Sequence, residues 1–147
     1  MIEEIAKYLT ENNLKLSIAE SCTGGLISSL FTDVAGASNY IEQNFVTYSP
    51  QSKTAILGVL PETIEHFGVA SEQVALEMAK GLIVRHGADF ALSTTGWLEP
   101  NKGMAFIGFA SKNKQKVIKY VSKKTSRIEI KQDIAQFAID FLAQNIL

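Results

Sequence analysis

Residues 21–25 are the part of the chain best suited to chemistry, because they hold a hydroxyl, a thiol, a second hydroxyl and two glycines. A β-type run at 14–19 precedes them and an apolar run at 26–31 follows, which predicts a strand, a tight turn and a helix start. Free N–H groups at a helix start hold anions, so Ser21 stands where a phosphate or a developing oxyanion could be held. In the structural alternative, Ser21 or Thr23 only caps the helix.

Lys53 is a second candidate, because it lies in the first turn of a helix that Ser49-Pro50 is expected to start. A helix start repels a cation, which lowers the pKa of a lysine, and an unprotonated lysine can take a proton from a serine hydroxyl. Neutralising a lysine costs roughly 4–5 kcal/mol, whereas a helix end supplies about 0.3–2 kcal/mol. Desolvation and a nearby cation must supply the rest. The alternative is that Lys53 points into solvent.

Arg127 is the third candidate, because it opens the last predicted helix. It could be the cation that lowers the pKa of Lys53, or it could grip a substrate phosphate with two hydrogen bonds. Spacing alone does not decide whether Ser21, Lys53 and Arg127 meet.

Other kinds of site find less support. Cys22 could be a nucleophile with His66 or His86, but no spacing links the thiol to either imidazole, and a lone cysteine is usually a small core residue. No Cys/His cluster has the spacing of a zinc site, and no acidic loop indicates calcium. Neither a Walker A sequence nor a GxGxxG motif is present.

Length and composition indicate one globular domain, 1–147, with a net charge of −1 and 46% hydrophobic residues. No apolar run is long enough for a transmembrane helix, and the acidic N-terminus has no signal-peptide pattern. Cys22 is the sole cysteine, so no internal disulfide can form. We therefore expect a cytoplasmic protein without membrane contact.

Basic residues are concentrated in the last third of the chain. Residues 100–147 carry nine basic and three acidic side chains, whereas residues 1–99 carry five and twelve. Such a patch could bind nucleic acid, or its lysines could protect a strand edge from pairing. Because Tyr120 is the one aromatic residue interleaved with them, the edge interpretation is favoured and nucleic acid is not an expected partner.

The apolar spacing predicts an α/β fold in which helices cover a mixed sheet. Helices are predicted at 2–11 and 23–33, from Ser49-Pro50 to before Gly58, from Ser71 to near Gly87, and from the capping box Ser126–Glu129 onward, with a single turn at 61–66. Strands are predicted at 14–20, 40–48, 88–95 with Gly96 as its end, 103–110 and 116–122. The short connection between 88–95 and 103–110 predicts antiparallel neighbours.

Several motifs in this chain together resemble the CinA C-terminal domain family. They keep the family's order and approximate spacing over nearly the whole chain: Ile18-Ala19-Glu20-Ser21-Cys22-Thr23-Gly24-Gly25-Leu26, Phe45-Val46-Thr47-Tyr48-Ser49 before Lys53, Gly68-Val69-Ala70-Ser71-Glu72, and Thr95-Gly96.

The resemblance implies a three-layer α/β/α domain that forms a dimer or trimer. It implies hydrolysis of nicotinamide mononucleotide to nicotinic acid mononucleotide and ammonia, without cofactor or metal. By position, the resemblance assigns catalytic roles to Ser21, Lys53, Tyr48, Thr95 and Arg127. It assigns substrate or phosphate binding to Cys22, Thr23, Gly24, Gly25, Gly96 and Arg127.

The chain departs from the family after Thr95-Gly96. Family members typically continue with a glycine-rich loop, whereas residues 97–103 here are shorter, nearly without glycine, and begin with Trp97. The indole could stack on a nicotinamide ring or fill the pocket. The alternative function is therefore a catalytically impaired, CinA-like protein that binds a nucleotide or regulates.

Overall fold

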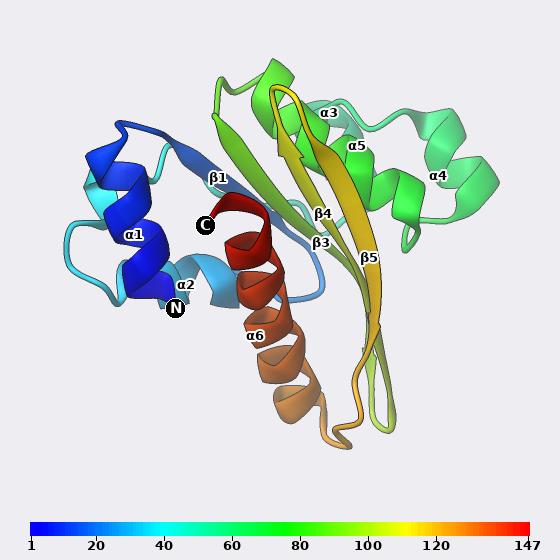
Figure 1. Ribbon diagram of the computed structural model, residues 1–147. Coiled ribbons are helices and arrows are strands. Elements are labelled where there is room, and N and C mark those ends of the chain that lie inside the picture. Colours follow the sequence, from blue (N-terminus) through cyan, green and yellow to red (C-terminus); the bar gives the residue numbers. More distant parts are fainter.

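The computed structural model describes residues 1–147 and combines helices with strands (Figure 1). The elements are α1 (Ile2–Glu11), β1 (Leu16–Glu20), α2 (Leu26–Thr32), the 3-10 helix η1 (Ala37–Asn39), β2 (Phe45–Val46), α3 (Pro50–Leu57), α4 (Pro61–Phe67), α5 (Glu72–Val84), β3 (Phe90–Glu99), β4 (Lys102–Ser111), β5 (Gln115–Val121) and α6 (Arg127–Ile146).

One five-stranded sheet runs through the molecule in the order β2-β1-β3-β4-β5. β1 pairs in parallel with both β2 and β3, whereas β3, β4 and β5 are antiparallel. The sheet is therefore mixed, and the antiparallel pairing predicted from the short connection after β3 is confirmed.

Two apolar clusters attach helices to the two faces of this sheet. The larger cluster joins α1, α2 and α6 to inward residues such as Ile18 and Leu92. The other joins α3 and α5 to Ala19, Ala91 and Ala110. Figure 1 shows α1, α2 and α6 on one side of the strands and α3, α4 and α5 on the other, so the predicted three-layer α/β/α architecture is confirmed.

The predicted helix starts are confirmed at three serines. The hydroxyls of Ser49, Ser71 and Ser126 each accept a hydrogen bond from the backbone N–H three residues later. This contact satisfies one of the free donors at a helix start. The cap at Ser49 matters most here, because it fixes the first turn of α3 and thus the place of Lys53.

Several predicted boundaries are wrong. The helix predicted at 23–33 is α2, which begins at Leu26, because Gly24 and Gly25 have φ values of 63° and 99°. The strand predicted at 40–48 is reduced to β2, and the single turn predicted at 61–66 is the full helix α4.

Gly96 does not end β3, which continues to Glu99. A Cβ added at Gly96 would lie 2.1 Å from the carbonyl oxygen of Met104 on the neighbouring strand. The glycine therefore permits a close backbone approach inside a long hairpin, and the segment predicted as a loop at 97–102 is mostly paired strand.

The lysine-rich strand β5 is an edge strand of the sheet. This position agrees with the interpretation of its lysines as protection against edge-to-edge pairing. None of the helices has the length and apolar character needed to cross a bilayer.

Candidate active site

The side chains of Ser21 and Lys53 meet where β1 ends and α3 begins. The Lys53 Nζ lies 2.9 Å from the Ser21 Oγ, although the two residues are distant in the chain. Ser21 is 7% exposed and Lys53 is fully buried. The structure therefore brings together the alcohol and the amine that the sequence singled out.

Lys53 is buried without an acidic partner. The protein's ion pairs involve neither Lys53 nor any residue beside it. Instead, its Nζ donates to the carbonyl oxygens of Thr47 at 2.6 Å and Tyr48 at 3.3 Å. Burial lowers the pKa of Lys53 from 10.5 to about 8, because the charged amine loses its hydration.

These contacts set the direction of the amine's lone pair. A neutral amine has two N–H bonds and one lone pair, and the carbonyls of Thr47 and Tyr48 can take both N–H bonds. The remaining neighbour within hydrogen-bond distance is the Ser21 hydroxyl. In the neutral state the lone pair can therefore accept the serine proton, which is the geometry of a nucleophile and its base.

Three hydroxyl side chains fall in one row of the sheet at this point. The register Ala19↔Phe45 and Ala19↔Ser93, continued by two residues, places Thr47 and Thr95 on either side of Ser21. The Thr47 Oγ1 is buried and has no hydrogen-bond partner. A buried polar atom without a partner calls for an explanation, and a role in the site is one that fits its place beside Ser21.

Backbone donors lie next to the alcohol as well. The N–H groups of Cys22 and Thr23 have no oxygen acceptor within the chain. The turn that presents them is held by a hydrogen bond of 2.9 Å between the hydroxyls of Thr23 and Thr94. These two N–H groups can therefore donate to an anion that forms beside Ser21.

The start of α2 is already occupied by the carboxylate of Glu20. Its oxygens accept from the Ile27 N–H at 3.0 Å, the Ser28 N–H at 2.9 Å and the Ser28 hydroxyl at 2.7 Å. Glu20 is fully buried. Phosphate binding by Gly24 and Gly25 at this helix start is therefore not supported, because the Ile27 and Ser28 N–H groups already donate to Glu20.

Glu20→Gln tests the structural role of this contact. The amide NH₂ of glutamine would face a backbone N–H of Ile27 or Ser28, which is also a donor. We therefore expect the free energy of unfolding to fall by about 1–3 kcal/mol. Urea denaturation measures it. The matched control is Glu72→Gln in the first turn of α5, where an exposed carboxylate is worth less than about 1 kcal/mol. Equal losses in the two variants would contradict the role given to Glu20.

Cys22 is not suited to be the nucleophile. Burial raises the pKa of its thiol to about 12, so the thiol remains protonated at neutral pH. It packs with Leu98, Ala105 and Ile130 on the α6 side of the sheet, which is the face opposite to Lys53.

The side chains of the remaining predicted residues are not hydrogen-bonded to Ser21 or Lys53. Tyr48 contributes its carbonyl, while its side chain is 62% exposed. The Thr95 hydroxyl donates to the carbonyl oxygen of Val69 at 2.9 Å. Gly96 packs against the backbone of β4.

Arg127 is not brought to Ser21 and Lys53. Its Nη1 donates to the carbonyl oxygen of Leu98 at 3.1 Å, and α6 packs on the face of the sheet opposite to α3. No cation is the cause of the lowered Lys53 pKa, which burial explains instead.

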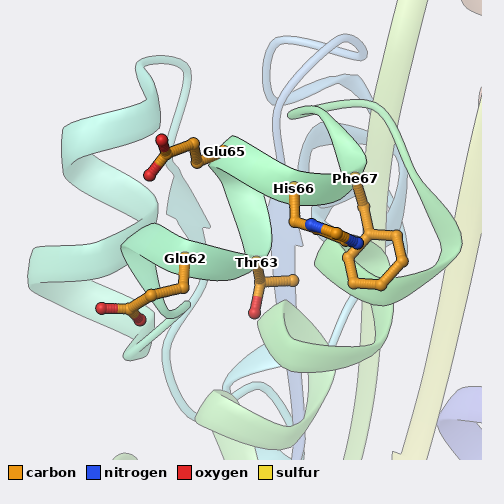
Figure 2. A pocket seen from close by; sticks show the side chains of 5 residues that line it. All are labelled: Glu62, Thr63, Glu65, His66 and Phe67. Atoms are coloured by element: carbon orange, nitrogen blue, oxygen red, sulfur yellow. The ribbon is translucent and has the colours of Figure 1, made fainter.

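A hollow on α4 does not coincide with this pair. It has a volume of about 670 Å³ and is lined by Glu62, Thr63, Glu65, His66 and Phe67, all on α4 (Figure 2). Figure 2 shows Glu62 and Glu65 pointing away from His66 and Phe67, so the polar groups do not converge. The buried Ser21–Lys53 pair, in which an alcohol contacts an amine base, is therefore the stronger candidate for catalysis. No group of three His, Cys, Asp or Glu side chains could hold a metal ion.

Two residues of the site escape prediction from sequence alone. Glu20 is the last residue of β1, and a carboxylate before a glycine-rich turn is the signal that could have indicated a helix cap. Thr47 carries no such signal, because a threonine in a β-rich run looks like an ordinary strand residue.

Comparison with known proteins identifies a matching family and several relatives. The profile of the family described as CinA C-terminal domain matches residues 1–146. A CinA-like protein from Chlorobium limicola is 50% identical over 101 residues, which cover 69% of this chain and 24% of that protein. One from Chlorobaculum tepidum is 46% identical over 117 residues, covering 75% and 28%. The chain thus spans about a quarter of the length of these relatives.

Solved structures share the fold. The competence/damage inducible protein CihA from Agrobacterium tumefaciens is 34% identical with a TM-score of 0.83, and the match covers 97% of this chain and 94% of that one. A CinA superfamily protein from Escherichia coli is 28% identical with a TM-score of 0.88, covering 97% and 85%.

Proposed function

Because the chain belongs to the CinA C-terminal domain family, we propose that it hydrolyses the carboxamide of nicotinamide mononucleotide to nicotinic acid mononucleotide and ammonia. The observation that carries the proposal is the 2.9 Å contact between the Lys53 amine and the Ser21 hydroxyl. The amine is fully buried, and its pKa is lowered to about 8. An alcohol beside a base of this kind is the arrangement used in acyl transfer.

The first step forms an acyl-enzyme. The neutral Lys53 amine takes the Ser21 proton while its two N–H groups donate to the carbonyl oxygens of Thr47 and Tyr48. The serine oxygen attacks the carboxamide carbon. The carbonyl oxygen becomes an oxyanion, which the Cys22 and Thr23 N–H groups are placed to stabilise. The C–N bond then breaks as the Lys53 ammonium gives its proton to the departing nitrogen, which leaves as ammonia.

The second step releases the acid. Lys53 is neutral again after ammonia leaves, so it can take a proton from a water molecule that attacks the ester carbon. The bond between that carbon and the Ser21 oxygen breaks, the lysine returns the proton to the serine, and the carboxylic acid product departs. One amide and one water give one acid and one ammonia.

The test is the release of ammonia from nicotinamide mononucleotide by the purified protein. We expect ammonia and nicotinic acid mononucleotide in equal amounts. Absence of both products, at protein concentrations high enough to detect one turnover, would contradict the proposed hydrolysis.

The rate should depend on pH through the Lys53 amine. With a pKa of about 8, only the fraction of molecules with neutral Lys53 can react. We expect kcat/KM to rise about tenfold per pH unit below that value and to level off above it. A profile measured from pH 5.5 to 9.5 checks this. A rate that is flat through pH 8 would contradict a lysine base.

Nucleotide binding without turnover is the second candidate function. The paired hairpin and half-exposed Trp97 in place of a flexible loop favour it. Calorimetry with nicotinamide mononucleotide distinguishes the two functions, because binding in the absence of any released ammonia supports this candidate alone.

A further inference from the structure

The antiparallel part of the sheet continues beyond α5 and leaves one face uncovered there. Figure 1 shows the hairpin end of β3 and β4 with α6 on one face only. On the other face, α5 covers the sheet only as far as Ser93 and Gly108. The Ser93 hydroxyl donates to the Ala75 carbonyl oxygen of α5, and a Cβ added at Gly108 would lie 2.5 Å from the same oxygen. Because strand side chains alternate between faces, Trp97 lies on this uncovered face.

Five side chains form what we call the exposed sheet surface: Trp97, Met104, Phe106, Lys119 and Val121. The strand register pairs Trp97 with Met104 and Met104 with Val121, and it pairs Phe106 with Lys119. Trp97 is 50% exposed and Val121 is 60% exposed. A surface of this kind is apolar and aromatic with one cation at its edge.

The exposed sheet surface begins beside the nucleophile. The register places Thr95 next to Ser21, and Thr95 is buried with its hydroxyl bonded to the Val69 carbonyl oxygen. Trp97 is therefore the first exposed side chain of β3 beyond Ser21. Strand spacing and rise put its Cα about 8 Å from that of Ser21, which is within reach of an indole ring.

Lys119 points back over this surface. Its Nζ lies 5.9 Å from the centre of the Phe106 ring, so the ammonium extends from the edge strand towards β4 and the side of Ser21. Lys102 shares the face but stands at the hairpin end, opposite Glu99 and farther from Ser21.

We propose that the exposed sheet surface binds the substrate, with Trp97 stacking on a cationic pyridinium ring and Lys119 pairing with the phosphate. This inference rests on the proposed function. The ring is bonded to the carbon that Ser21 attacks, so its binding surface must adjoin Ser21. An indole is the best aromatic partner for a cation, and an ammonium pairs with a phosphate.

The other anion-binding candidates support the choice of Lys119. The start of α2 is filled by the Glu20 carboxylate, and Arg127 is hydrogen-bonded to Leu98 on the α6 side. Lys119 is the cation on the exposed sheet surface itself. The substrate class that follows is a pyridinium nucleotide with a phosphate, in preference to the uncharged nucleobase amides or the riboside.

The experiment uses the fluorescence of Trp97, which is the sole tryptophan of the chain. The probes are nicotinic acid mononucleotide, nicotinamide riboside and inorganic phosphate. We expect the mononucleotide and the riboside to quench the emission saturably, with the mononucleotide binding roughly tenfold or more tightly, since one charge-assisted contact is worth about that factor. Inorganic phosphate alone should not quench.

Variants separate the two contacts. Lys119→Gln should weaken binding of the mononucleotide at least roughly tenfold and leave the affinity for the riboside within about twofold of the wild type. The matched control Lys116→Gln, on the same strand but paired with Phe109 on the opposite face, should change neither. Trp97→Ala, followed by calorimetry, should weaken both ligands.

Each outcome bears on the proposal. Equal mononucleotide affinity in Lys119→Gln and Lys116→Gln would overturn it, as would binding by calorimetry without any change in Trp97 emission. An emission spectrum that changes with protein concentration in the absence of ligand would mean that a second copy covers Trp97, which also overturns it. Quenching without ammonia release would support ligand binding at the exposed sheet surface and contradict the proposed hydrolysis. Hydrolysis with an unchanged KM in Lys119→Gln would support the hydrolysis and contradict the binding role of Lys119.

Discussion

Ser21→Ala is expected to lower kcat for ammonia release by about 10⁴-fold or more, and Lys53→Met by about 10³–10⁴-fold. The alanine removes the atom that forms the acyl-enzyme, and the methionine removes the base that activates it. Because the two side chains act as one unit at 2.9 Å, the double variant should be no slower than Ser21→Ala alone. Steady-state release of ammonia measures all three.

Matched variants show whether the effect is local. Ser17→Ala replaces a buried serine on the same strand, and Lys80→Met replaces an exposed lysine on α5. Both should keep kcat within about threefold, because neither touches the pair. Activity that survives in Ser21→Ala but disappears in Cys22→Ser would transfer the nucleophile to the thiol and contradict this account.

The second large effect is on stability as a function of pH. In the folded chain Lys53 has a pKa of about 8, against an ordinary value of 10.5. Below pH 8 the lysine is charged in both states, so the folded state bears the full cost of burying the charge. Between pH 8 and 10.5 only the unfolded chain holds the proton, so the stability of the wild type should rise with pH relative to Lys53→Met.

The size of this rise follows from the difference between the two pKa values, which corresponds to about 3 kcal/mol. The hydrogen bonds lost in Lys53→Met are absent at every pH. They therefore change the difference in unfolding free energy between the two proteins by a constant and leave its slope against pH unchanged. Urea unfolding at pH 7, 8, 9 and 10.5 measures the difference, with Lys80→Met as the control that should show no slope. A difference that stays constant across this range would show that Lys53 is charged in the folded state throughout.

Local signals in the sequence predicted most elements of the fold. Serine followed by proline at 49–50, and the serines at 71 and 126, mark helix starts through contacts that involve neighbouring residues alone. The short connection after β3 likewise limits the next strand to an antiparallel neighbour. These inferences succeeded because the interactions behind them are local.

Predictions failed where a contact outside the local turn or helix pattern decides the structure. Gly96 looks like a strand end, yet its role depends on the Met104 backbone across the hairpin. The start of α2 looks like an anion site, yet the Glu20 carboxylate reaches it first. The Gly96 contact has no counterpart in the spacing of residues, whereas the position of Glu20 before a glycine-rich turn is a local signal that could have indicated the second contact.

The candidate pair itself was predictable only in part. Residue types and helix starts singled out Ser21, Lys53 and Arg127, and two of the three meet. From the sequence we expected a nearby cation to help lower the pKa of Lys53, but burial without a counter-ion lowers it instead. Burial depends on the packing of α3 against β1 and α5, which no local pattern reveals.

The most direct measurement is the titration of Lys53 itself. Lysines labelled with ¹³C at Cε can be followed by NMR from pH 6 to 11 in the wild type, with Lys53→Met to assign the signal. We expect one lysine that titrates near pH 8 and whose signal is missing from the variant. If Lys53 titrates with the others, near their usual pKa of about 10.4, it cannot serve as the base for Ser21 at neutral pH.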